Sequence, residues 1–370
     1  MNQTAMAFQE DELMGELELR ILDELKEMPV TILDYPKNKA SRQHLWLYIS
    51  AFQKACRRGH TEVAWEAADK LWQLGRSNHL MKRLATVAGE DIGLGDPKTA
   101  IKILVGWKNR AEVTAYRSGD ESWIFQLMKD ACEAKKNRLG DHFNLLRHID
   151  PDYLKWNHVL SKVRNPTDWV EAEHKDLEPI RRAIKVSMGF RKWAGQLEVP
   201  DVKKKTHGGQ PKQLLMWLDR YKPISNWLKL ACKIQVAKNL SPHWTNILAA
   251  KMAGINLCGL EDTELDIPEP TMLAPGVPDY AVDKHSGEGK RTMGYLGAKY
   301  GKLDLGNLIF IMEGVQVRVE RTNEDMRQIE KSMLADYIQN GILAGTFKED
   351  WEREIEADLL KARKKILNVS

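Results

Sequence analysis

The sequence lacks the loops that proteins use to bind nucleotide phosphates. It contains no G-x-x-x-x-G-K-[ST] segment and no G-x-G-x-x-G segment between a strand and a helix. The segment most similar to these motifs, Gly287-Glu288-Gly289-Lys290, is too short and has no predicted strand before it. The H-E-x-x-H, G-x-S-x-G and protein-kinase signatures are missing as well. These absences argue against an NTPase or a Rossmann enzyme, and no cofactor is expected.

Cysteines are few and stand far apart, at Cys56, Cys132, Cys232 and Cys258. None belongs to a C-x-x-C pair, and none has a neighbouring histidine at the spacing of a metal site. No metal site is therefore predicted from local spacing. A site assembled from residues that are distant in the sequence stays open. We expect the thiols to be buried and reduced.

Long apolar runs are also missing. No segment approaches the ~18 apolar residues that cross a bilayer, and the acidic start FQEDELMGELELR lacks the basic region of a signal peptide. Hydrophobic residues make up 43% of the chain and charged residues 29%, which is ordinary for a folded soluble protein. The sequence thus predicts a cytoplasmic protein without a membrane partner.

Positive charge is concentrated in one part of the chain, although the net charge is only +4. Residues 1–30 hold eight acidic residues and two basic ones, whereas residues 181–251 hold fifteen basic residues and three acidic ones. Aromatic residues are interleaved with this basic stretch: Phe190, Trp193, Trp217, Tyr221, Trp227 and Trp244. Cations neutralise phosphates and exposed aromatic rings stack on bases, so the mixture predicts contact with single-stranded or distorted DNA.

We assign this contact to the basic residues Arg191, Lys192, Lys203, Lys204, Lys205, Lys212, Lys290 and Arg291. The lysine-rich loop at 203–205 is the expected mobile contact. An alternative interpretation is that the tryptophans pack a core while the lysines only solvate outer faces.

Hydrophobic periodicity predicts an all-α fold, built as a helical bundle or stacked helical hairpins. The expected helices cover the block 42–110 and then 121–138, 179–195, 211–220, 223–238, 242–254, 286–300, 322–340 and 347–367. Residues 140–178 are expected to be irregular or short-helical, and the proline-rich 267–280 to form an extended crossing or linker. The run at 314–320 is the one plausible strand. Four regions are expected: an acidic N-terminal arm (1–40), a first helical domain (41–140), a basic helical domain (141–265) and a crossing with C-terminal helices (266–370).

Residues 42–138 resemble the helical region that follows the ATPase module in the family of replication-associated recombination protein A, also called maintenance of genome stability protein A. The matching positions are Tyr48, Ile49, Ser50, Ala51, Lys54, Arg83, Leu84, Glu90, Asp91, Ile92, Gly93, Leu94, Asp96 and Pro97. Gly95 stands where that pattern usually has alanine. The resemblance implies a scaffold related to the clamp-loader collar, with a tendency to form homo-oligomers. The ATPase domain is missing, so loader activity is not implied.

Within this stretch, Glu90 and Asp91 are expected to end one helix, and Asp96-Pro97 to begin the next after a turn that contains Gly93 and Gly95. The same two carboxylates are also candidate catalytic residues.

A second cluster, at 278–301, looks like an element of ATPase-free members of this helical group, many of them from phages. Asp283 and His285 stand directly before a helix that Ser286 caps, and they can form an acid–base pair. Lys284, Lys290 and Arg291 then hold phosphate near the helix N-terminus. In the alternative interpretation Asp283 and His285 form a surface cap that satisfies backbone groups.

Two functions follow from these patterns. The first is a replication or repair accessory without ATPase activity, which binds DNA and meets a polymerase, a clamp loader or a single-strand-binding protein. The alternative is a DNA-acting enzyme, such as a phage thymine-hypermodification transferase in the host cytoplasm, with Asp283 and His285 at the active site.

Overall fold

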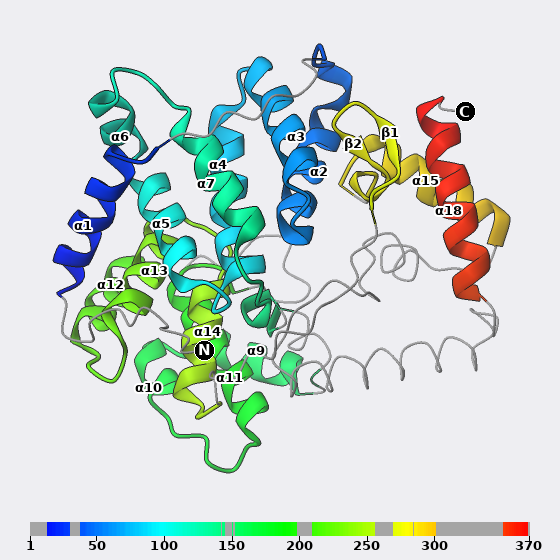
Figure 1. The fold of residues 1–370 in the computed structure, drawn as a ribbon. Coiled ribbons are helices and arrows are strands. Elements are labelled where there is room, and N and C mark those ends of the chain that lie inside the picture. The colour runs from blue at the N-terminus through cyan, green and yellow to red at the C-terminus, as the bar shows by residue number, and fades with distance from the viewer. Residues whose placement is uncertain are drawn as a thin grey trace, which may run out of the picture. The chain divides into compact units, whose positions relative to one another are not determined.

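The computed structural model describes residues 13–29, 38–141, 143–144, 150, 152–197, 209–255, 269–283, 285–300 and 351–368. These residues form two compact units, each assembled from separate stretches of chain. Unit 1 comprises Met1–Pro29, Ala88–Trp123 and Lys135–Leu260, and unit 2 comprises Val30–Val87, Ile124–Ala134 and Glu261–Ser370. The chain is mainly helical, as the periodicity predicted (Figure 1).

The helices of unit 1 are α1 (Met14–Lys26), a π-helical turn η2 (Ala88–Ile92), α5 (Pro97–Lys108), α6 (Arg110–Tyr116), α9 (Tyr153–Lys162), α10 (Pro166–Val170), α11 (Pro179–Trp193), α12 (Pro211–Arg220), α13 (Asn226–Ala237) and α14 (His243–Met252). Helix α11 packs on α14, and α1 packs on α5 and α13. Helix α1 buries Leu17, Ile21 and Leu25, so this part of the expected N-terminal arm belongs to a core.

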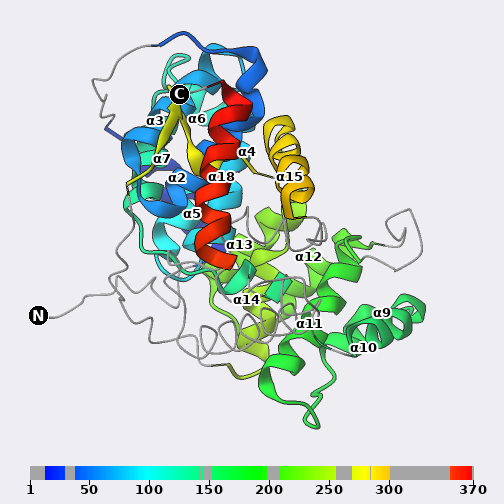
Figure 2. The same ribbon diagram turned by 90° about the vertical axis from the view of Figure 1, so that its right-hand side faces the viewer.

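Unit 2 contains η1 (Arg42–His44), α2 (Leu45–Arg58), α3 (Thr61–Gln73), α4 (Ser77–Val87), most of α7 (Trp123–Glu133), β1 (Met272–Ala274), β2 (Val277–Pro278), η3 (Asp279–Ala281), α15 (Gly287–Tyr300) and α18 (Trp351–Leu367). Helices α2 and α3 form a hairpin, and Gly59 joins them in the left-handed conformation at φ +76°. Helices α15 and α18 lie side by side (Figure 2).

The prediction of an extended proline-rich crossing is wrong over the described residues 269–280. A β-hairpin stands there, with Met272 opposite Pro278 and Ala274 opposite Val277. Pro275 and Gly276 form the turn, and Gly276 takes the positive φ of +69° that such turns need. The turn signal of the Pro-Gly pair therefore outweighs the polyproline tendency of the segment.

Helix boundaries agree closely with the periodicity where the chain is described. The helices expected at 211–220 and 286–300 lie at Pro211–Arg220 and Gly287–Tyr300, whereas the one expected at 121–138 ends at Glu133. The run at 314–320 and the helix expected at 322–340 lie outside the described residues. Cys56, Cys132 and Cys232 are buried and belong to no disulfide, as expected, and Cys132 Sγ donates to Cys56 Sγ at 3.8 Å. None of the described helices combines the length and the apolar character that spanning a membrane requires.

Candidate functional site

The residues predicted as catalytic fall in two separate places. Asp283 and His285 belong to unit 2, next to α15, whereas Glu90 and Asp91 belong to unit 1, in the turn η2. Lys284 and the lysines at 203–205 lie outside the described residues. We therefore treat the two places as distinct candidate sites.

Asp283 is held by an ion pair and hydrogen bonds inside unit 2. Its Oδ2 accepts a hydrogen bond from Ser50 Oγ at 2.5 Å and lies 2.9 Å from Lys54 Nζ. Its Oδ1 accepts from the backbone N–H of His285 at 2.8 Å. Lys54 Nζ also donates to the Tyr280 carbonyl at 3.0 Å. Asp283 and Lys54 are 2% and 5% exposed, so the pair is desolvated.

The electrostatics of this pair favour a charged carboxylate. Burial acts to raise the pKa of Asp283, but the Lys54 charge and the hydrogen bonds from Ser50, Lys54 and His285 outweigh it, and the pKa lies below its usual value. A general base needs access to its substrate, and this carboxylate is buried among structural partners. The surface position that the cap interpretation gave to Asp283 is therefore wrong.

The His285 contact with Asp283 is made by the backbone N–H, and the side chain of His285 is exposed. The geometry therefore favours the cap interpretation of this pair. Ser286 caps α15 as predicted: its Oγ accepts from the Gly289 N–H at 2.9 Å and donates to the Asp283 carbonyl at 3.0 Å. Lys290 and Arg291 are exposed on the first turns of α15.

Sequence reasoning missed that Ser50 and Lys54 face Asp283. The two residues stand one turn apart on α2, among buried apolar neighbours, and both belong to the family-like pattern. A lysine on the apolar face of a helix is a signal for a buried counter-charge, because an unpaired buried ammonium is costly. The sequence did not reveal which carboxylate supplies it.

Glu90 and Asp91 lie in the predicted corner between two helices. After the π-helical turn η2, Gly93 takes a positive φ of +47°, and Asp96 caps α5 by accepting from the Thr99 N–H at 3.0 Å. The helix–turn–helix interpretation of this motif is confirmed. π-Helical turns are often found at functional sites, because they widen the helix and redirect its side chains.

Arg138 joins the acidic side chains of this corner. Its Nε lies 3.2 Å from Asp91 Oδ1, one terminal nitrogen lies 3.5 Å from Glu90 Oε1, and the same nitrogen donates to Asp141 Oδ2. Asp91 is fully buried, and its backbone carbonyl accepts from the Asn137 N–H at 2.8 Å. The guanidinium thereby fixes the carboxylates, and Asp91 serves packing more than solvent chemistry.

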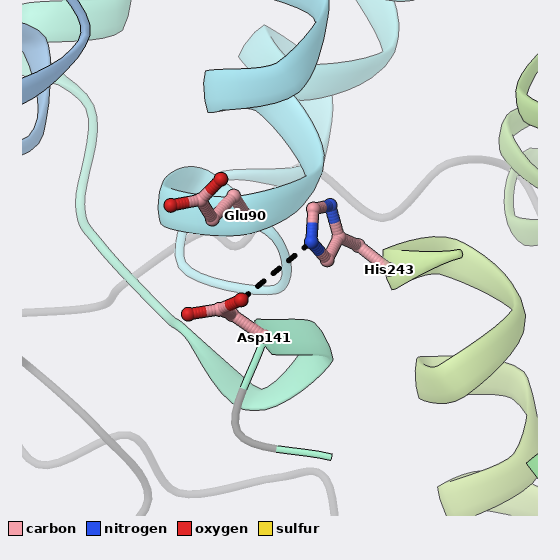
Figure 3. Close-up of side chains that lie close together, drawn as sticks. All are labelled: Glu90, Asp141 and His243. Atoms are coloured by element: carbon pink, nitrogen blue, oxygen red, sulfur yellow. Dashed lines mark ion pairs between the residues drawn. The ribbon is translucent and has the colours of Figure 1, made fainter. Parts of the chain in front are cut away.

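Glu90, Asp141 and His243 bring their side chains together from three segments (Figure 3). Each offers one oxygen or nitrogen atom, and these atoms lie within 4.8 Å of one another. His243 Nε2 is 3.7 Å from Asp141 Oδ1. Sequence reasoning selected Glu90 but missed Asp141 and His243, because nothing in their local sequence indicates that they meet.

A pocket of about 600 Å³ opens beside α12 in unit 1. Its lining includes Trp217 and Tyr221, whose rings stack with centroids 4.7 Å apart and an interplanar angle of 19°. Trp217 Nε1 donates to Glu171 Oε1 at 2.7 Å, which fixes the indole. Arg220 and Met216 also line the pocket and are exposed.

Two of the basic residues assigned to DNA have structural roles. Arg191 is 4% exposed and donates to Asn144 Oδ1. Lys192 Nζ donates to the carbonyls of Leu160 at 2.7 Å and Ser161 at 3.0 Å, where it satisfies the C-terminus of α9. Burial lowers the pKa of Lys192. Lys212, in contrast, is exposed on α12.

The aromatic residues of the basic stretch mostly pack the core. Phe190, Trp193 and Trp244 are at most 1% exposed, and Trp217 is 9% exposed. These rings pack the core, as the alternative interpretation holds for the tryptophans, and Trp193 and Trp217 also line the pocket beside α12. Tyr221 and Trp227 are partly exposed, and of these Tyr221 lines the pocket.

Comparisons with models of known families, with curated proteins and with solved structures gave no match to this chain.

Proposed function

We propose that this chain is a DNA-associated accessory protein that binds unpaired DNA at the α12 face of unit 1 and does not hydrolyse nucleotides. The observation that carries the proposal is the position of an aromatic pocket among exposed cations. Trp217 and Tyr221 line the pocket with Arg220, while Lys212 and Lys222 are exposed at either end of the same segment.

The chemistry of the pocket suits a base that has left the duplex. Proteins that bind single strands combine a cationic surface for the backbone with aromatic faces for the bases. The volume of about 600 Å³ lies within the range of small-ligand pockets, ~300–1,000 Å³. Glu171 offers carboxylate oxygen at the same pocket, which can accept from a base amine.

The wider role rests on the family resemblance. On that basis the proposal includes a role in replication or repair, with a polymerase, a clamp loader or a single-strand-binding protein as partner and a homo-oligomer as the assembly. A cytoplasmic location is part of the same proposal. We do not propose the transferase alternative, because Asp283 is buried and paired with Lys54.

Removing the charges of the α12 face should weaken single-strand binding and its salt dependence. Each phosphate contact contributes roughly 0.7 to the slope of log affinity against log salt for single strands. The triple variant Lys212→Ala, Arg220→Ala, Lys222→Ala should therefore lower that slope by about 2. Fluorescence anisotropy with a labelled oligothymidylate, measured over a range of salt concentrations, checks this.

A matched control removes the same charge elsewhere on unit 1. Lys155, Lys162 and Lys175 are exposed and lie outside the α12 segment, so their triple alanine variant should bind nearly as the parent does. Tyr221→Ala should weaken binding by about 1–3 kcal/mol and leave the salt slope unchanged, since stacking is not ionic. Equal losses in both triple variants would show that binding is not localised at α12.

A further inference from the structure

The carboxylates of Glu90 and Asp141 and the imidazole of His243 form a cluster, here called the EDH cluster, in unit 1. We propose that the EDH cluster binds a first-row divalent cation of the Mn²⁺ to Zn²⁺ series. This inference does not depend on the proposed DNA binding.

The first argument is the state of His243. Its side chain is 5% exposed, and neither ring nitrogen forms a hydrogen bond within the described part of the chain. The 3.7 Å between Nε2 and Asp141 Oδ1 exceeds hydrogen-bond length. Buried polar groups are nearly always hydrogen-bonded, to protein or to water, so an imidazole that faces two carboxylates at longer range suits a bound water or a cation between them. A cation between the three side chains satisfies it.

The second argument is how closely the backbone is built around His243. A Cβ on Gly89 would lie 3.2 Å from His243 Cβ, and a Cβ on Gly140 would lie 2.8 Å from the His243 carbonyl oxygen. These glycines directly precede Glu90 and Asp141. The residues that directly precede both carboxylates are therefore glycines at the points where the start of α14 approaches. This close approach brings the imidazole opposite the two acids (Figure 3).

Arg138 provides the orientation that metal ligands need from their neighbours. Its guanidinium binds Asp141 Oδ2, while Oδ1 of the same carboxylate faces His243. It also lies 3.5 Å from Glu90 Oε1. Hydrogen bonds of this kind fix the ligand geometry, and their loss typically costs 10–100-fold in metal affinity.

The donor set indicates the class of ion. One imidazole with two carboxylates suits Mn²⁺, Fe²⁺ and Zn²⁺, whereas Mg²⁺ and Ca²⁺ prefer oxygen donors alone. Zn²⁺ should bind more tightly than Mn²⁺. Three protein ligands also leave a coordination position for water or another small ligand.

Titration of the chelator-treated full-length chain with Zn²⁺, with Mn²⁺ and with Mg²⁺, followed by calorimetry, tests the proposal. We expect one Zn²⁺ site, weaker binding of Mn²⁺, and no displacement of Zn²⁺ by excess Mg²⁺. Glu90→Gln, Asp141→Asn and His243→Gln should each weaken Zn²⁺ binding at least tenfold. Zn²⁺ should raise the melting temperature of the parent and not that of Glu90→Gln.

His285→Ala is the matched control, because this exposed histidine lies outside the EDH cluster and its loss should leave Zn²⁺ binding unchanged. Melting curves of all variants, measured with chelator present, show which variants are folded. If His243→Gln is not folded, Glu90→Gln tests the site instead, because Glu90 is partly exposed and glutamine has the same shape as glutamate. The proposal is wrong if the folded parent binds no Zn²⁺ at one equivalent, or if Glu90→Gln and Asp141→Asn bind it as tightly as the parent does.

Discussion

Lys54→Met is expected to lower the free energy of unfolding by about 3–5 kcal/mol, because it leaves a buried carboxylate without its counter-charge. Asp283 is 2% exposed and lies 2.9 Å from Lys54 Nζ. Methionine retains much of the apolar stem, so the loss reports the charge and its hydrogen bond to the Tyr280 carbonyl. Urea denaturation followed by circular dichroism measures the change.

Two further variants separate charge from packing. Lys82→Met removes an exposed lysine of the same unit and should change stability by less than about 0.5 kcal/mol. The double variant Lys54→Met, Asp283→Asn removes both charges and should be more stable than Lys54→Met alone. A double variant no better than the single one would contradict a charge-based loss.

The pH dependence of the same pair has a defined sign. The pKa of Asp283 is lowered in the folded chain, where Lys54 and the hydrogen bonds outweigh the effect of burial. Its contribution to stability is therefore fully present above the unfolded pKa of about 3.9 and is lost as the pH falls through the folded value. Asp283→Asn should make acid unfolding less steep below about pH 4.

Gly289→Ala is the second substitution with a large expected effect. A Cβ at this position would lie 1.6 Å from the Asp283 carbonyl oxygen, which is backbone and moves only if the cap of α15 moves. Overpacking typically costs about 1–3 kcal/mol, and a clash with backbone at this range should reach the upper end or exceed it. Thermal melting with circular dichroism detects the loss.

Two glycines of the same helix provide the comparison. A Cβ on Gly287 or on Gly294 would meet no neighbouring atom within 4 Å, so alanine fits at both positions. Gly294→Ala should be neutral or stabilising, by up to about 1 kcal/mol, since alanine is the better helix former. If Gly289→Ala has the same melting temperature as Gly294→Ala, then α15 does not pack against the Asp283 backbone as described.

The sequence was most informative where a pattern is local. Apolar periodicity located the helix at Pro211–Arg220, and capping chemistry located the turn before α5, where Asp96 accepts from Thr99. The hairpin at Met272–Pro278 was missed because four prolines nearby suggested an extended chain, although Pro275-Gly276 is also a turn signal.

The sites depend on contacts between distant segments, and the sequence was least informative there. Glu90 was selected from a motif, but Asp141 and His243 meet it only after folding. Gly95 illustrates the same point. A Cβ at this position would lie 2.4 Å from the Lys135 carbonyl oxygen. The close backbone of a segment forty residues further along the chain therefore leaves no room for a side chain at Gly95.

The separation of Lys54 and Asp283 along the chain has a consequence for biosynthesis. Ser50, one helical turn before Lys54 on α2, is 233 positions from Asp283. Translation adds roughly 5–20 residues per second. Asp283 is consequently synthesised on the order of 10–50 s after Lys54. During that interval the α2–α3 hairpin cannot bury Lys54 with its native partner, so unit 2 reaches its native packing only after residue 283 has been synthesised.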